Sequence, residues 1–414
     1  MIATRRVVAH LSVLPINLQS IYMLTFISLA YLALSTPNML ILSEAQVKRC
    51  LTLENCIAAN RKALAALRSS KGDKNKNQHQ KSLIALPGSA LVPGRIGLPR
   101  CLEEPSPLST SSSVVVPKDT TLFKPAAYYG TSEGADTLMG MKVISIRAKN
   151  AELGKPTATA TITMLDAETG EVTAVIGGTY LTAARTAAGS AIATKVILEQ
   201  KQINKSTKQN VVVFGAGIQA EMHIRMLNCI LPGQIDKVSI FNRSRKRAEG
   251  LRDSLRNDPD TSHLECSVAT YDQDTVLKET VGNADIIVTA TNTAFPLFDW
   301  SWVNSNCHIN GIGSYLSSSE EVDSVFVRDH CITVADTIEA LDTVGDLKLL
   351  DGSSENFAGL LGDLLDGSVT IGDSAISNKR TFFKSVGTCV QDIFTADEVI
   401  KNARSLGIGT EVEM

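Results

Sequence analysis

The sequence predicts an α/β protein built around a doubly wound parallel sheet, preceded by a region of antiparallel or mixed sheet. Apolar residues 211–214 run directly into Gly215-Ala216-Gly217, and a helix-like pattern follows. From residue 205 onward, short apolar segments alternate with helical stretches. Strands are expected at 211–214, 237–241, 264–269, 285–289, 308–311 and 331–335. Six strands with intervening helices and a glycine-rich first turn are typical of a Rossmann sheet.

The glycine turn predicts a dinucleotide site. Gly215 suits a sharp turn, and Gly217 lets the backbone approach a pyrophosphate. Ala220, in the third position of the pattern, keeps the helix close to its strand. Ile218 and Gln219 begin this helix, whose unpaired N–H groups attract phosphate.

The end of the second expected strand bears on the choice of cofactor. An NAD site usually has Asp or Glu there to bind the ribose hydroxyls, whereas this strand ends in Asn242-Arg243-Ser244, without a carboxylate. Arg243, Ser244 and Arg245 can receive a 2′-phosphate, so the sequence favours NADPH, with NADH or NAD as the alternative. The other interpretation is that these residues only begin a solvated helix.

The first half of the chain combines a hairpin with a long helix. Residues 142–148 and 157–164 alternate like strands, and turn residues 166–170 lead to a further strand at 171–176. An alanine-rich helix is expected over 178–200, with Thr182 as its N-cap. Earlier, Ser43 and Thr52 are each placed to begin a helix.

Two basic residues of this half are candidates for a binding or catalytic role. Arg185 is expected in the first turn of the 182–200 helix, where the dipole disfavours a cation unless an anion is shared. The anion would be a substrate carboxylate or a cofactor phosphate, and the alternative is a pair with a nearby Asp or Glu. Lys142 leads a strand, and burial there would lower its pKa and suit a substrate ligand or proton donor; the alternative is a surface lysine.

Ligands of doubly wound sheets bind at the carboxyl ends of the strands. Those ends include Thr289-Ala290-Thr291 and the stretch from Asn310 to Tyr315. His308 lies inside a strand, which favours a packed histidine over a catalytic base. Residues 381–408 read as one amphipathic helical region that packs on the first domain or on a partner subunit.

Composition is that of an ordinary globular protein. The 414 residues are 44% hydrophobic and carry a net charge of −3, which gives no indication of a nucleic-acid partner. The eight cysteines form no CxxC pair, which favours free thiols in a reducing, cytoplasmic setting, and no metal site is predicted. The expected domains are an atypical segment 1–38, a first domain 39–200, a dinucleotide-binding domain 201–345, and a C-terminal return 346–414.

Residues 1–38 differ in kind from the rest. The apolar run 21–34 is short for a membrane span and resembles the core of a signal peptide. We expect these residues to be removed or unused, with a membrane anchor as the alternative and organellar or secretory targeting left open.

The chain from Met39 onward resembles the ornithine cyclodeaminase and mu-crystallin family. The matching stretches occur in family order and cover most of the chain. They are MLILSEAQV, PGRIGLP, LFKPAAY, MGMKVISI, ATITMLDAETGEVTAVIGGTYLTAARTAAGSAIATK, VVVFGAGIQAEMH, HINGIGSY and FFKSVGTCVQDI.

The resemblance implies a homodimer in which a split N- and C-terminal α+β domain dimerises and binds substrate, while a Rossmann domain binds NAD(P)(H). It places Arg95, Lys142 and Arg185 around the substrate carboxylate and the reacting nitrogen. Thr182 and Thr186 would lie at the nicotinamide or phosphate side, and Asn150 matches a family Asn that follows the lysine strand.

One departure from the family pattern bears on the reaction. Tyr315 stands where cyclodeaminases have a catalytic Asp, which deamination of an unactivated amine needs. Relatives with Ser-Tyr here look like reductases of cyclic imino acids. We therefore expect an NADPH-dependent ketimine reductase, with Tyr315 or Lys142 as the proton donor. The alternatives are an NAD-dependent ornithine cyclodeaminase and a non-catalytic NADPH-dependent binder of small molecules.

Overall fold

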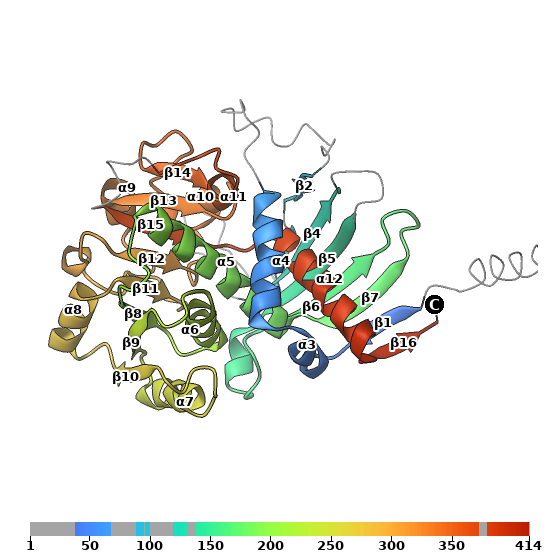
Figure 1. The fold of residues 1–414 in the computed structure, drawn as a ribbon, viewed down its shortest axis with the longest axis horizontal. Coiled ribbons are helices and arrows are strands. Elements are labelled where there is room, and N and C mark those ends of the chain that lie inside the picture. The colour runs from blue at the N-terminus through green and yellow to red at the C-terminus, as the bar shows by residue number, and fades with distance from the viewer. Residues whose placement is uncertain are drawn as a thin grey trace, which may run out of the picture.

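The computed structural model describes residues 38–67, 88–94, 96–99, 119–130, 137–371 and 379–413. These residues form two eight-stranded sheets, one mostly antiparallel and one wholly parallel, with helices between and around them (Figure 1). The segment 1–37, Arg95 and Cys101 lie outside the described residues, so the interpretations of them stay predictions. Among the described helices, none is both long and apolar enough to cross a bilayer.

The antiparallel sheet has the strand order β16-β1-β7-β6-β5-β4-β2, with β3 pairing with β4. Its strands alternate between the covered and open faces, as the sequence pattern predicts. Their bounds are β1 Met39–Leu42, β2 Ala90–Leu91, β3 Ile96–Pro99, β4 Thr120–Tyr128, β5 Leu138–Ile146, β6 Ala158–Leu165, β7 Val172–Gly177 and β16 Thr410–Val412.

Helices α3 (Glu44–Cys50), α4 (Leu53–Ala65), α5 (Thr179–Gln200) and α12 (Cys389–Leu406) accompany this sheet. Ser43 and Thr52 cap α3 and α4 as predicted, each accepting a backbone N–H in the first turn. Helix α12 packs on β4, β5 and β6, so the first and last parts of the chain share one domain. Figure 1 shows α4 and α12 together on the same side of the sheet.

The parallel sheet has the order β10-β9-β8-β11-β12-β15-β13-β14, which reverses direction between β8 and β11. All six predicted strands are present within two residues of their expected bounds. The bounds are β8 Gln209–Phe214, β9 Ile235–Phe241, β10 Glu265–Ala269, β11 Ile286–Thr289, β12 His308–Gly311, β13 Cys331–Ala335, β14 Phe357–Leu360 and β15 Arg380–Lys384. The helices around this sheet include α6 Ile218–Ile230, α7 Arg245–Arg256, α8 Asp274–Gly282, α9 Ser324–His330, α10 Ala340–Thr343 and α11 Leu361–Leu365. The doubly wound Rossmann fold is thus confirmed.

Two sequence interpretations of the C-terminal part were wrong. Residues 381–384 are not helical but belong to β15, which lies between β12 and β13, and α12 begins only at Cys389. The segment Thr381–Lys384 is buried, and a short apolar run buried on both faces cannot be assigned to helix or strand by periodicity. Because β14 and β15 belong to the parallel sheet, the chain returns to the first domain after Lys384 and not at residue 346.

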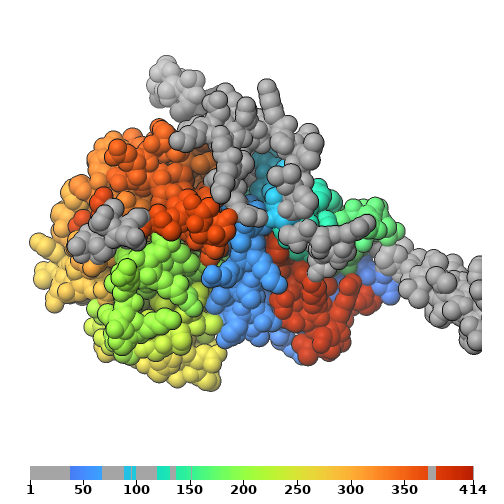
Figure 2. All heavy atoms as spheres, turned by 45° about the horizontal axis from the view of Figure 1, so that its top comes forward, coloured from blue at the N-terminus to red at the C-terminus, as the bar shows by residue number. Residues whose placement is uncertain are grey.

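Helix α5 joins the two halves and is almost wholly buried. It packs on α4, α6 and α12, and its alanines allow these close approaches. The helix starts at Thr179 with Gly178 as N-cap, so the prediction of Thr182 as N-cap was wrong. The carboxylate of Glu44 accepts the N–H groups of Thr179 and Tyr180, a long-range cap that local sequence cannot reveal. In Figure 2, the blue N-terminal part lies between the orange and green half and the red C-terminal part.

Candidate functional site

Three charged side chains meet where β5, α5 and α12 converge. Lys142 Nζ lies 2.7 Å from Asp392 Oδ2, and Arg185 Nε donates to Asp392 Oδ1 at 2.8 Å. Lys142 and Asp392 are fully buried and Arg185 is 3% exposed. The structure thus brings together Lys142 and Arg185, as the resemblance implies, and adds an aspartate that the sequence interpretation missed. We call these three residues the buried triad.

The position of Arg185 differs from the sequence interpretation. It lies in the second turn of α5, because the helix begins at Thr179. The alternative considered for it, a pair with an acidic residue, is confirmed by the contact with Asp392. Gln391 Oε1 accepts Arg185 Nη1 at 3.5 Å, and among the described residues no hydrogen bond uses Nη2. Part of the guanidinium fork therefore remains available to an anion.

Burial and charge set the protonation of the triad. Burial, followed by the charge of Arg185, lowers the pKa of Lys142 to about 8, while Asp392 opposes this shift. Burial alone would raise the pKa of Asp392, but the positive charges of Arg185, Lys142 and Lys124 hold it below its ordinary value. A lysine with a pKa near neutrality can donate a proton at physiological pH and then be protonated again by solvent.

A second lysine adds to the positive charge. Lys124 of β4 lies directly opposite Lys142 in the β4–β5 register, and like charges at opposed positions are unfavourable without a compensating anion. Lys124 Nζ donates to the carbonyl of Gly387 at 2.9 Å, next to Arg185. Lys124 also helps to lower the pKa of Asp392, so three cations lie around this carboxylate.

The glycine turn has the geometry that a dinucleotide needs. Gly215 has φ +115, and a Cβ there would lie 2.5 Å from the carbonyl oxygen of Ala290, so glycine is required. Gly217 is the N-cap of α6, and a Cβ on it would enter open space. No side chain caps this helix in the described structure, so N–H groups of its first turn, which includes Ile218 and Gln219, are open to phosphate.

Two buried oxygens near the starts of α5 and α6 lack partners. They are Thr182 Oγ1 and Gln219 Oε1, and no described atom forms a hydrogen bond with either. Buried polar groups are normally bonded, so unsatisfied atoms on two helices that pack together fit a polar ligand such as a dinucleotide. Thr186 differs, because its hydroxyl donates to the carbonyl of Thr182 within the helix.

The residues after β9 carry no acidic group. Ser244 caps α7 by accepting the N–H of Arg247, and Asn242 Nδ2 donates to the carbonyl of Ser244. Arg245 pairs with Glu249 along the helix, whereas Arg243 is exposed and makes no ion pair within the described structure. Among the described residues, Arg243 is therefore a cation of this strand end that an acidic side chain does not neutralise.

Sequence interpretation missed Glu321, which organises the loops after β11 and β12. Its buried carboxylate accepts from the hydroxyls of Thr289 and Thr291, from the Thr291 N–H, and from the N–H groups of Gly313 and Ser314. The hydroxyls of Thr289 and Thr291 are thus already used as donors. The backbone around Ala290 closes on Gly215, which holds the loop against the turn.

The remaining predicted residues fall outside the triad. Tyr315 is half-buried after β12, burial raises its pKa, and within the described structure it makes no hydrogen bond. His308 is packed as expected, with Nδ1 at 3.0 Å from the hydroxyl of Thr381. Asn310 donates to Thr194, and Asn150 donates to the carbonyl of Pro156 in the turn after β5.

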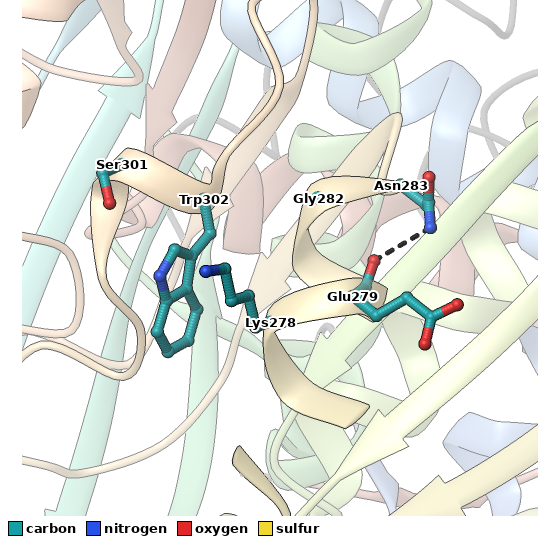
Figure 3. Close-up of a pocket in the computed structure, with 6 residues that line it drawn as sticks. All are labelled: Lys278, Glu279, Gly282, Asn283, Ser301 and Trp302. Carbon is teal, nitrogen blue, oxygen red and sulfur yellow. Dashed lines mark hydrogen bonds between the residues drawn. The ribbon is translucent and has the colours of Figure 1, made fainter. Parts of the chain in front are cut away.

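A surface hollow of about 500 Å³ lies elsewhere, between α8 and the 3-10 turn Trp300–Trp302. Figure 3 shows Lys278 beside the ring of Trp302, and the amide of Asn283 bonded to the carbonyl of Glu279 at the end of α8. This hollow is open and shares no residue with the triad or the glycine turn. The triad and the glycine turn are therefore the candidate functional site.

Comparison with known proteins identifies the family of this chain. The model of the ornithine cyclodeaminase/mu-crystallin family matches residues 126–407. An uncharacterized cyclodeaminase of Dictyostelium discoideum is 30% identical over 91% of this chain and 100% of its own length. A Δ1-pyrroline-2-carboxylate reductase of Bacillus thuringiensis is 28% identical over 74% of this chain and 89% of its own.

A solved structure shares the fold. Thermococcus litoralis Δ1-pyrroline-2-carboxylate reductase, solved with NADH and L-proline, has a TM-score of 0.71 and 24% identity, covering 90% of this chain and 100% of its own. The reductases among these proteins agree with the class expected from the sequence, an oxidoreductase that uses a nicotinamide cofactor. The chain belongs to the ornithine cyclodeaminase/mu-crystallin family.

Proposed function

We propose that this protein is an NADPH-dependent reductase of cyclic imino acids. Its substrate would be Δ1-pyrroline-2-carboxylate or Δ1-piperideine-2-carboxylate, and its product proline or pipecolate. The observation that carries the proposal is the buried triad, in which a lysine and an arginine share one aspartate and retain capacity for an anion. Relatives named Δ1-pyrroline-2-carboxylate reductase and ketimine reductase support the same chemistry.

Each triad residue has a distinct part in this reaction. Arg185 would bind the substrate carboxylate through Nη2, because its Nε is held by Asp392. Lys142, with its pKa lowered to about 8, would hold a proton at Nζ and deliver it to the ring nitrogen. Asp392 keeps Lys142 charged and both side chains fixed. Arg95, which lies outside the described residues, would add a second contact to the carboxylate.

The cofactor would bind across the glycine turn. Gly215, Gly217 and the first turn of α6 would receive the pyrophosphate, and Arg243 with Ser244 the 2′-phosphate. Thr182 and Gln219, whose buried oxygens have no hydrogen-bond partner among the described residues, would contact the nicotinamide side. When bound, NADPH would supply a hydride for the imine carbon and become NADP⁺, and Lys142 would supply the proton for the ring nitrogen, so that the C=N bond becomes CH–NH.

A second candidate is an ornithine cyclodeaminase. The Dictyostelium relative is named an uncharacterized cyclodeaminase, and Asp392 provides a carboxylate beside Lys142 even though Tyr315 replaces the expected aspartate. Lys142 and Arg185 both donate to Asp392 Oδ1, however, Lys142 Nζ also lies 2.7 Å from Oδ2, and the carboxylate is fully buried. Such a carboxylate suits the fixing of Lys142 better than the binding of a substrate ammonium, so we place reduction first.

We also propose that the protein acts as a homodimer. Helices α3, α4 and α12 lie on one side of the antiparallel sheet (Figure 1), while Ile41, Ile96 and Leu98 on its strands are exposed. Exposed apolar side chains on a sheet face that no described helix covers are typical of an interface between subunits. Sedimentation of the purified protein should then show a species of twice the chain mass.

The decisive assay offers both reactions to one preparation. NADPH oxidation is followed with each of the two cyclic imines, and NAD-supported ammonia release is followed with ornithine. The proposal expects imine reduction and little ammonia. Ammonia release as the dominant reaction would favour the cyclodeaminase, and tight NADPH binding with neither reaction would leave a non-catalytic binder.

A further inference from the structure

The loop Ser385–Thr388 carries the chain from β15 of the parallel sheet to α12 of the other domain. It is therefore a covalent link between the half that would bind the cofactor and the helix that holds Asp392. The loop also touches Arg185, because a Cβ on Gly387 would overlap the guanidinium nitrogens of that arginine. A displacement of this loop would therefore change the position of the guanidinium directly.

Asp336, at the end of β13, fixes this loop to the parallel sheet. Its Oδ2 accepts the Val386 N–H at 3.0 Å, the Gly387 N–H at 2.7 Å and the Ser385 hydroxyl at 3.0 Å. The residue is 1% exposed, and its Oδ1 is buried without a hydrogen-bond partner in the described structure. One oxygen atom thus holds three consecutive residues of the link.

The opposite side of the loop is held by the first domain. Lys124 Nζ donates to the carbonyl of Gly387, the same residue whose N–H is bound to Asp336. Gly387 has φ +72, a conformation that glycine adopts without strain. The peptide groups of Gly387 are therefore fixed from both domains, directly against Arg185.

We propose that Asp336 is a positioning residue for Arg185, acting through the loop Ser385–Thr388. The inference rests on the proposed role of Arg185 as the ligand of the substrate carboxylate. Loss of the three hydrogen bonds would release Gly387 and let the guanidinium shift. Small displacements of a substrate-binding group have large effects on substrate use, whereas the glycine turn, which is built by β8 and α6, does not depend on this loop.

The test compares Asp336→Ala, Asp336→Asn and Gly387→Ala with the wild-type enzyme. Asn keeps one oxygen to accept the three hydrogen bonds, and its NH2 group can occupy the place of the unpartnered Oδ1. Asp336→Asn should therefore keep the loop in its position. Gly387→Ala perturbs the contact between the loop and Arg185 directly, because the added Cβ overlaps the guanidinium. Asp285→Ala is the matched control. Asp285 also accepts a backbone N–H of the parallel sheet, that of Asn210, but it lies at the amino ends of the strands, away from the loop.

For Asp336→Ala and Gly387→Ala we expect KM for the cyclic imine to rise by about 10- to 100-fold, with little change in the Kd for NADPH. Asp336→Asn and Asp285→Ala should keep a KM close to that of the wild-type enzyme. Equal losses of imine and NADPH affinity in Asp336→Ala would overturn the inference, because they would indicate general damage to the domain. So would an Asn variant as impaired as the Ala variant.

A measurement that needs no turnover separates this inference from the proposed function. Arg185 is almost fully buried, so phenylglyoxal should modify it slowly in the wild-type protein, as read from its peptide by mass spectrometry. We expect faster modification in Asp336→Ala and Gly387→Ala, but not in Asp285→Ala. Unchanged reactivity of Arg185 in Asp336→Ala would overturn the inference. Faster modification in a protein that reduces no imine would support the inference while contradicting the proposed function.

Discussion

Arg185 Nε donates to Asp392 Oδ1 at 2.8 Å, joining two helices whose residues are 207 positions apart in sequence. Both side chains are buried, and Lys142 Nζ also donates to Oδ1, at 2.9 Å, and lies 2.7 Å from Oδ2. Removing one member of a buried ion pair leaves an uncompensated charge, which typically costs about 3–5 kcal/mol. This contact therefore links the stability of the domain to the arrangement of the site.

Substitution of Asp392 should change the pH dependence of the reaction. Lys142 must be protonated to act as the donor, so kcat/KM should fall as the pH rises through about 8, the pKa of Lys142. Asp392 raises that pKa, so Asp392→Asn should move the alkaline limb to lower pH and reduce kcat at neutral pH by about tenfold or more. A pH profile of kcat/KM tests this. An alkaline limb that stays in place would exclude Lys142 as the proton donor.

Arg185→Ala should weaken binding of the imino acid and leave cofactor binding intact. We expect KM for the imine to rise by about 100-fold, because a charge-assisted contact to the carboxylate is lost. Arg185→Lys is the control; it keeps the charge but not the planar fork and should recover only part of the activity. Steady-state kinetics with the imine and NADPH varied separately give both constants. Full activity of the alanine variant would contradict the role of Arg185.

Arg243→Ala should reduce discrimination between the two cofactors. Loss of its contact with the 2′-phosphate should weaken NADPH binding by about tenfold and leave NADH binding almost unchanged. Arg245→Ala is a matched control, since that side chain pairs with Glu249 instead. Fluorescence titration with both cofactors measures the effect. Equal weakening of both would show that Arg243 does not contact the phosphate.

Acid should destabilise the protein in part through His308. Burial, followed by the charge of Lys201, lowers its pKa to about 3, whereas an unfolded histidine titrates near 6.5. Between these values the unfolded chain binds more protons, so stability falls as the pH drops below about 6.5. His308→Gln should reduce the loss between pH 7 and 5 by on the order of 2 kcal/mol. Urea unfolding at pH 7 and at pH 5 measures the loss of unfolding free energy, with substitution of the exposed His263, His263→Gln, as the control. The same loss in His308→Gln as in the wild-type protein would contradict this account.

Much of the fold could be predicted because the signals are local. The glycine turn, the six strand segments and the caps Ser43 and Thr52 depend on residues adjacent in sequence. Strand β15 could not be separated from α12, because a short buried run has no diagnostic period. The start of α5 was misplaced since its cap comes from Glu44, far away in sequence.

The site was predicted in part for the same reason. Lys142 and Arg185 were singled out by position and by the family resemblance, and they do lie together. Asp392, Asp336 and Glu321 act through contacts between elements distant in sequence, which no spacing reveals. The Gln-Asp pair in FFKSVGTCVQDI was the one available signal for Asp392, since two polar residues follow an apolar stretch there.

The central claim, hydride transfer to an imine carbon, is tested most directly with NADPH deuterated at both C4 positions. Proline formed from Δ1-pyrroline-2-carboxylate should carry one deuterium at C2, as seen by mass spectrometry. Proline without the label, or ammonia release from ornithine with no reduction of the imine, would contradict the account.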